Sequence, residues 1–215
     1  MSVITLHIDG ALVAVPAGVT LLQACRAASV ALPLLCHHEQ LAPVAACRLC
    51  LVELEGSERP LAACITTALE GMVVTTASET LQAHRALVIE LLLAEGNHPC
   101  PVCVVDGACE LQDLAIALGV NQLQLAEQLP RHALDASHAR FVLDRNRCIL
   151  CTRCVRACAE VEGAHVWDVA YRGSDCRLIA GLDQPWGEVD SCSSCGLCVQ
   201  VCPTGALFAK PELAR

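Results

Sequence analysis

Long apolar runs are absent from this sequence, although its mean hydropathy is +0.50. A helix that spans a membrane needs about 20 consecutive apolar residues. The stretch from Ala11 to Cys36 is interrupted by Pro16 and Arg26, and the stretch from Ala86 to Ala94 is short and carries Glu90. The sequence therefore predicts no membrane insertion.

Aromatic residues are also scarce, since the chain has two tryptophans, one tyrosine and two phenylalanines among its 215 residues. Because 54% of the residues are nevertheless hydrophobic, alanine, leucine and valine are expected to fill small cores. Small modules bury too little apolar surface for stability, and disulfides or metals usually supplement them. The 17 cysteines of the chain are the candidates for that supplement.

Positive charge is in short supply, with 14 lysines and arginines against 23 acidic residues and a formal net charge of -9. No basic stripe is available to neutralise phosphates, so the sequence predicts no nucleic-acid partner. The nucleotide-binding motifs G-x-G-x-x-G and the P-loop are missing as well, so no NAD, FMN or ATP site is expected in this chain. No Ser-His-Asp set stands out, and no catalytic residue is predicted.

A secretory signal is not evident either, because Met1 to Gly10 has no basic region followed by an apolar core. An odd number of cysteines arranged in tight C-x2-C pairs fits intracellular metal binding better than an extracellular disulfide framework. The sequence therefore predicts a cytoplasmic protein whose cysteines bind metal.

The most informative stretch that is present runs from Cys148 to Cys202. The spacing C-x2-C-x2-C-x3-C occurs twice, as CILCTRCVRAC and as CSSCGLCVQVC. This doublet is typical of a chain that holds two 4Fe-4S clusters, with the fourth cysteine of each run reaching across to the other cluster. The first predicted ligand set is Cys148, Cys151, Cys154 and Cys202. The second is Cys192, Cys195, Cys198 and Cys158.

Another set of cysteines lies near the N-terminus, as Cys36-x10-Cys47-x2-Cys50-x13-Cys64. A loop with three thiolates and a fourth from a later strand suits a 2Fe-2S cluster, although the plant-type pattern has a first gap of four residues rather than ten. Four cysteines could equally close a zinc tetrahedron.

The segments before Cys36 favour the ferredoxin. Residues 3 to 8 alternate like a strand, Asp9-Gly10 predicts a hairpin turn, and Thr20 is expected to cap a helix that extends to Ala28. His37 and His38 are expected to face solvent or to form local hydrogen bonds rather than to bind metal.

The third set of candidate ligands is His98-x-Cys100-x2-Cys103-x5-Cys109. One imidazole and three thiolates fit a 4Fe-4S cluster but also a zinc ion, and His98 could instead be a helix-capping residue without metal. A helix over residues 79 to 95 precedes the set. Thr76 or Ser78 could cap it, Gly96 suits a left-handed end, and its nearly continuous apolar surface predicts burial on most faces.

The remaining segments are expected to be structural. A short helix carries Leu111 and Leu118 and stops at Gly119, and Pro130 should break any long helix in the connection that follows. Residues 141 to 143 predict a strand, and a hairpin is expected around Gly173-Ser174. Cys25 and Cys176 fall outside the ligand spacings and are interpreted as structural residues.

Three short sequence motifs resemble those of a known family. LCHHE and ACRLCLVE, around the N-terminal cysteines, resemble the 2Fe-2S domain shared by complex I and several hydrogenases. CELQDLA, beginning at Cys109, resembles the histidine-ligated 4Fe-4S domain that follows it there. The order of the three sites resembles that in the small iron–sulfur subunit of the diaphorase module in bacterial NAD-reducing nickel–iron hydrogenases. This resemblance covers essentially the whole chain.

The large iron–sulfur subunit of complex I begins in the same way, but two features differ. Its pattern is usually H-x3-C where this chain has His98-x-Cys100, and it continues into a long molybdopterin-type domain, whereas no such domain is expected after Arg215.

The resemblance implies an α+β fold with one 2Fe-2S and three 4Fe-4S clusters. It implies a β-grasp 2Fe-2S domain at 1–78, a small helical domain with a histidine-ligated cluster at 79–119, and a two-cluster ferredoxin domain with an inserted hairpin at 120–215. It also implies an electron relay between a partner subunit that binds FMN and NAD and the small and large subunits of a nickel–iron hydrogenase. An equivalent subunit of an NAD-dependent formate dehydrogenase or a complex I-like enzyme, and a zinc-binding interaction protein, are the alternatives.

Overall fold

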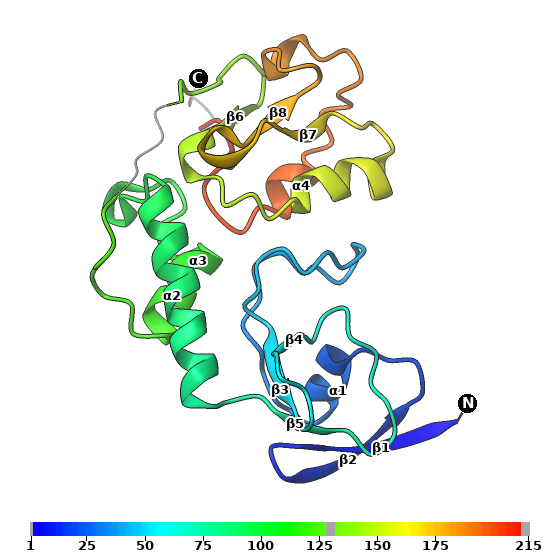
Figure 1. The fold of residues 1–215 in the computed structure, drawn as a ribbon. Helices are drawn as coiled ribbons and strands as arrows, with labels where there is room; N and C mark the ends of the chain where they lie inside the picture. The colour runs from blue at the N-terminus through cyan, green and yellow to red at the C-terminus, as the bar shows by residue number, and fades with distance from the viewer. Residues whose placement is uncertain (1, 128–131, 212–215) are drawn as a thin grey trace.

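The computed structural model describes residues 2–127 and 132–211 and has three parts that follow one another along the chain (Figure 1). A five-stranded sheet with one short helix lies at one end, two helices lie at the side, and a unit with two small sheets lies at the other end. This mixture confirms the α+β class. No helix within the described ranges is long and apolar enough to cross a membrane. Pro130 lies outside the described residues.

The N-terminal sheet has the strand order β2-β1-β5-β3-β4. Its strands are β1 (Val3–Ile8), β2 (Ala11–Pro16), β3 (Leu51–Leu54), β4 (Leu61–Ala62) and β5 (Val73–Thr75). β1 runs antiparallel to β2 and parallel to β5. The predicted hairpin turn is confirmed, because Asp9 and Gly10 adopt φ values of 49° and 83°, as a two-residue turn between strands requires.

Helix α1 (Leu21–Ala27) begins at the predicted cap. The Thr20 hydroxyl accepts from the Gln23 amide, and the Gln23 side chain accepts from the Thr20 amide at 2.8 Å, which completes a capping box that the sequence analysis overlooked. The helix packs into a core of leucine, isoleucine, valine, alanine and cysteine, in which Cys25 is fully buried.

Helix α2 (Glu79–Glu95) has the predicted bounds, but two expectations about it are wrong. Leu87 and Leu91 are 46% and 43% exposed, so the helix is buried along one face only. Gly96 has φ of -112° and is extended rather than left-handed. A Cβ at Gly96 would clash with Nε2 of His98, so glycine leaves room for the imidazole at the end of the helix.

The cap and the anchor of α2 are also defined by the structure. Ser78 caps the helix through the Leu81 amide, whereas the other candidate, Thr76, hydrogen-bonds to Asp9. Arg85 is the buried charge of the helix, and its guanidinium donates to the Leu49, Leu51 and Thr76 carbonyls. These bonds attach α2 to the N-terminal unit. They are stronger than neutral hydrogen bonds because the donor is charged.

Short elements carry the chain past the third candidate ligand set. The 3-10 turn η1 (Cys100–Val102) precedes helix α3 (Glu110–Ala117), which packs beside α2. The predicted helix end at Gly119 is confirmed by its φ of 71°.

The C-terminal unit contains two antiparallel strand pairs. They are β6 (Phe141–Leu143) with β9 (Leu207–Ala209), and β7 (Trp167–Ala170) with β8 (Arg177–Ala180). The second pair confirms the hairpin predicted around Gly173-Ser174. The helical elements here are η2 (Arg145–Arg147), α4 (Arg153–Arg156), the π-helical η3 (Ala157–Glu162), η4 (Gly173–Asp175), η5 (Trp186–Glu188) and α5 (Leu197–Gln200).

The few aromatic side chains of the protein all belong to this C-terminal unit. Trp186 is 1% exposed and packs against the rings of Trp167, Phe141 and His138 at centroid distances of 4.6 to 5.5 Å. The two tryptophans meet edge to face, a favoured aromatic geometry. The N-terminal core has no aromatic residue among its buried members, which agrees with the expectation of small aliphatic cores.

Candidate metal centres

The structure brings the four N-terminal candidate ligands together from the segments after α1, before β3 and after β4. Cys36, Cys50 and Cys64 are almost completely buried, and Cys47 is half-buried. The thiols form two hydrogen-bonded pairs, Cys36 with Cys47 and Cys50 with Cys64. The partner's hydrogen bond lowers the pKa of Cys47 to about 5 and that of Cys50 to about 7. The same interactions raise the pKa of Cys36 and Cys64, so one sulfur of each pair is favoured as a thiolate, the form that binds metal.

The backbone around this site also favours thiolates. Amides near Cys47, including that of Leu49, donate to its sulfur and lower its pKa further. The amide of Cys47 in turn donates to Sγ of Cys36 at 3.4 Å. Hydrogen bonds to sulfur ligands stabilise negative charge and set the potential of an iron–sulfur cluster.

The two histidines beside Cys36 differ from each other. His38 accepts a hydrogen bond from the Gln40 amide, as a locally bonded side chain was expected to do. His37 has a side chain that is only 14% exposed, and its Nε2 lies 3.5 Å from Glu39. Of the two positions expected for His37, solvent-facing or in local contact, the structure shows the second, and burial lowers its pKa.

At the third set, the His98 ring is placed as a metal-binding imidazole would be. Burial lowers the pKa of His98, so the ring is neutral at pH 7, and it hydrogen-bonds to the Leu92 backbone. Its Nε2 is buried and has no hydrogen-bond partner within residues 2–127 and 132–211. A ligating histidine uses one nitrogen for a backbone or carboxylate partner and leaves the other for the metal, so this imidazole fits a ligand.

Two of the three cysteines of this set lie at or next to contacts with the C-terminal unit. Cys109 is buried at the start of α3, and Cys103 accepts a hydrogen bond from Arg147 at 3.3 Å. The Glu110 amide donates to the Pro203 carbonyl, which follows Cys202 in the chain. The third site is therefore built at the boundary with the doublet.

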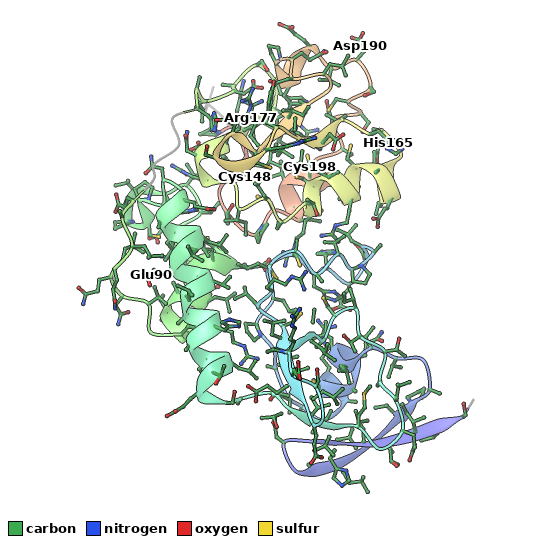
Figure 2. All side chains as sticks on the ribbon, viewed as in Figure 1. Glu90, Cys148, His165, Arg177, Asp190 and Cys198 are labelled. Carbon is green, nitrogen blue, oxygen red and sulfur yellow. The ribbon has the colours of Figure 1, made fainter. Side chains whose placement is uncertain are left out.

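The eight cysteines of the doublet surround two separate voids. One, a cavity of about 20 Å³, is lined by four of them, namely Cys148, Cys151, Cys154 and Cys202. The other, also of about 20 Å³, is lined by the remaining four, namely Cys158, Cys192, Cys195 and Cys198. One cysteine of each run thus crosses to the void of the other, and Figure 2 marks Cys148 and Cys198, from different runs, in the same unit.

The thiols around the two voids fit a site that metal completes. Burial raises the pKa of Cys151 to about 11 and the pKa values of Cys148 and Cys198 to about 12. Without metal these groups stay protonated at pH 7, so a cluster would displace their protons when it binds. Two sulfurs around the second void accept N–H hydrogen bonds, Cys158 from the Val166 amide and Cys192 from the Trp186 ring.

Three arginines in or next to the first cysteine run contact residues at the other candidate sites. Arg156 is 7% exposed and donates to the carbonyls of Cys36 at 2.5 Å, Ala42 at 2.6 Å and Cys151 at 3.3 Å. Arg153 is 4% exposed and forms a bidentate ion pair with Glu110, at 2.6 and 2.8 Å.

Arg147, the third of them, reaches Cys103. Sequence reasoning missed all three arginines, although the alternation of arginine and cysteine in this run was a possible signal.

Comparison with known families matches three consecutive parts of the chain. The descriptions are "2Fe-2S iron-sulfur cluster binding domain" for residues 2–79, "NADH-ubiquinone oxidoreductase-G iron-sulfur binding region" for 85–123, and "NADH-quinone oxidoreductase subunit 3, ferredoxin-like domain" for 140–208. Iron–sulfur domains of both the 2Fe-2S and the 4Fe-4S type are therefore present.

Two curated relatives match nearly the whole chain. NADPH-Fe(3+) oxidoreductase subunit alpha of Geobacter sulfurreducens is 38% identical over 97% of this chain and 24% of its own length. The mitochondrial NADH-ubiquinone oxidoreductase 78 kDa subunit of Neurospora crassa is 38% identical over 99% of this chain and 28% of its own length. The chain thus spans about a quarter of the length of these relatives.

A solved structure matches this chain over most of both lengths. It is a chain of the crystal structure of NAD+-reducing [NiFe]-hydrogenase in the H2-reduced state, with a TM-score of 0.91 and 38% identity over 97% of this chain and 88% of the other. The family resemblance seen in the cysteine pattern is confirmed. The chain belongs to the family of iron–sulfur diaphorase subunits of NAD-reducing nickel–iron hydrogenases, which is related to the N-terminal part of the large iron–sulfur subunit of complex I, and its role is that of an electron relay.

Proposed function

We propose that this chain passes single electrons between a partner subunit that binds FMN and NAD(H) and a nickel–iron hydrogenase of small and large subunits, in the reversible coupling of H2 oxidation to NAD+ reduction. The observation that carries the proposal is the pair of separate voids in the C-terminal unit, each lined by four cysteines of which one comes from the other cysteine run. The likeness to a chain of an NAD+-reducing hydrogenase supports the choice of partners.

Each of the four groups of candidate ligands is proposed to hold one cluster. The 2Fe-2S ligands are Cys36, Cys47, Cys50 and Cys64. The ligands of the three 4Fe-4S clusters are His98, Cys100, Cys103 and Cys109; Cys148, Cys151, Cys154 and Cys202; and Cys158, Cys192, Cys195 and Cys198. We place the domain boundaries at 78/79 and 119/120, describe the first domain as a β-grasp, and assign the protein to the cytoplasm.

Iron–sulfur clusters supply one-electron chemistry when they are bound. The residues of this chain hold the ligands at fixed positions, exclude water by burial, and donate hydrogen bonds to sulfurs, as the Trp186 ring does to Cys192. A neutral imidazole at His98 leaves its site one unit less negative than a fourth thiolate would, which favours the reduced state. None of the residues of the four groups is assigned to bond making or breaking.

An equivalent relay subunit of a complex I-like enzyme or of an NAD-dependent formate dehydrogenase is the second candidate. The relatives named as NADH-ubiquinone oxidoreductase 78 kDa subunit and NADPH-Fe(3+) oxidoreductase subunit alpha favour the first of these. Identification of the subunits that co-purify with the chain separates the candidates, because a nickel–iron pair supports the hydrogenase and a molybdenum subunit supports the formate dehydrogenase.

Anaerobically purified protein is expected to be brown and to contain iron and acid-labile sulfide at about 14 atoms each per chain, the sum for four clusters of usual composition. Metal and sulfide analysis of the same sample measures this. Colourless protein with stoichiometric zinc would instead support the zinc-binding interaction protein and end the relay proposal.

A further inference from the structure

The side chain of Arg147, in the doublet unit, contacts the sulfur of a candidate ligand of a different site. It immediately precedes Cys148, yet its NH1 group donates to Sγ of Cys103 at 3.3 Å. The side chain is 16% exposed, and its Nε lies 3.1 Å from Oδ2 of Asp144. The positive charge is therefore largely removed from water and lies between a carboxylate and a sulfur.

The surroundings hold this contact in place. The Thr204 hydroxyl donates to the Arg147 carbonyl at 2.8 Å. A Cβ on Gly205 would lie 3.3 Å from both NH1 of Arg147 and Sγ of Cys103, and 3.0 Å from Val105. Because the segment after Cys202 fits so closely around the guanidinium and the sulfur, a side chain at position 205 would press on both.

The same charge also acts on the imidazole of this site. Burial is the main reason that the pKa of His98 is low, and the positive charge of Arg147 lowers it further, whereas Asp144 opposes that effect. Two of the four candidate ligands of one cluster, Cys103 and His98, thus lie within the field of one guanidinium.

We propose that Arg147 is a positioning residue that raises the reduction potential of the cluster held by His98, Cys100, Cys103 and Cys109. The inference rests on the proposed function, since it requires that a cluster occupies this site. An added electron makes the cluster more negative, and a charged donor to a ligand sulfur stabilises that form more than the oxidised one. Desolvation strengthens the effect because the interaction is screened less than in water. The doublet unit thereby sets the potential of its neighbour.

The test uses the full complex with all clusters bound and a redox titration followed by electron paramagnetic resonance. Arg147→Gln is expected to decrease the reduced-to-oxidised ratio of the His98 cluster at the wild-type midpoint about tenfold, which corresponds to about 59 mV for one electron. Arg147→Lys keeps the charge but has a single donor group, and it should restore part of the ratio.

A variant with the opposite expected effect on the reduction potential keeps the test decisive if Arg147→Gln loses its cluster. Asp144→Asn removes the carboxylate that neutralises Arg147, while an asparagine oxygen can still accept from Asn146 as Asp144 does. It is expected to increase the reduced fraction of the His98 cluster. A decrease or no change would overturn the proposal.

Arg145→Gln is the matched control. It removes the same charge from the same segment, but the Arg145 Nε donates to the Leu178 carbonyl, and its charge acts on Cys148. Its effect on the His98 cluster should be smaller than that of Arg147→Gln. Equal shifts in both variants, or an unchanged midpoint in Arg147→Gln with all signals present, would refute the role of Arg147 and leave the relay intact, whereas wild-type protein without cluster signals would refute the relay itself.

Discussion

Replacement of Cys202 by serine is expected to abolish the 4Fe-4S cluster whose other ligands are Cys148, Cys151 and Cys154, although Cys202 belongs to the second cysteine run. The Cys202 side chain lines the same void as these three residues, not the void of its neighbours Cys195 and Cys198. A serine oxygen is a poor replacement for a thiolate at an iron–sulfur site. Electron paramagnetic resonance of the reduced protein measures which cluster signal disappears.

The matched control for this prediction is Cys198→Ser, which should remove the other cluster of the doublet. Cys176→Ser should remove neither, because Cys176 lines neither of the two cysteine voids. If Cys202→Ser removed only the cluster of Cys192, Cys195 and Cys198, the crossed assignment would be wrong.

The same variant should destabilise the C-terminal unit. The proposed crossed ligation would tie the segment between α5 and β9 to the loop before α4, so each cluster would also act as a cross-link between distant segments. The free energy of metal binding is partly folding free energy, so chelation of iron is expected to unfold this unit. The N-terminal hairpin is expected to retain more structure, because its core contains Leu6 and Val15 beside the cysteines. Hydrogen exchange of the two units measures the difference.

Replacement of Arg156 by methionine is expected to detach the loop of the N-terminal cluster site from the C-terminal unit. Arg156 is 7% exposed, and its guanidinium donates to carbonyls on both sides of the contact. Those of Cys36 and Ala42 lie on one side and that of Cys151 lies on the other. Hydrogen bonds from a charged donor contribute about 1.5–3 kcal/mol each, and carbonyls left buried without a partner add a penalty. A loss of about 3 kcal/mol or more in the free energy of this contact is therefore expected.

Denaturant titration, together with limited proteolysis after residue 75, measures the loss. The prediction includes a kinetic readout, because a displaced loop should slow electron exchange between the 2Fe-2S cluster and the Cys148 cluster while both signals persist. Glu160→Gln is the control at the same contact: the Ala42 amide donates to Glu160, and a glutamine oxygen can still accept. A methionine variant as stable as this control, with unchanged exchange rates, would contradict the role given to Arg156.

Much of the local structure could be predicted from neighbouring residues. The turn at Asp9-Gly10, the cap at Thr20 and the bounds of α2 depend on contacts within a few residues, and each was confirmed. The predictions that failed depended on distant parts of the chain. Gly96 is extended at the point where the next amide, of Asn97, donates to the distant Asn146 carbonyl, and Leu87 is exposed because α2 packs on one side only.

By itself the sequence determined the family and the grouping of candidate ligands, because C-x2-C spacing places thiols on one short loop whatever the rest of the chain does. The ligand sets stay predictions until the metal is measured. Only the tertiary structure revealed the contacts of the arginines in and next to one cysteine run. Arg147 contacts Cys103, Arg153 contacts Glu110, and Arg156 contacts Cys36. A long side chain can point to any neighbour, and its partner is decided by how distant segments pack, which spacing along the chain does not encode.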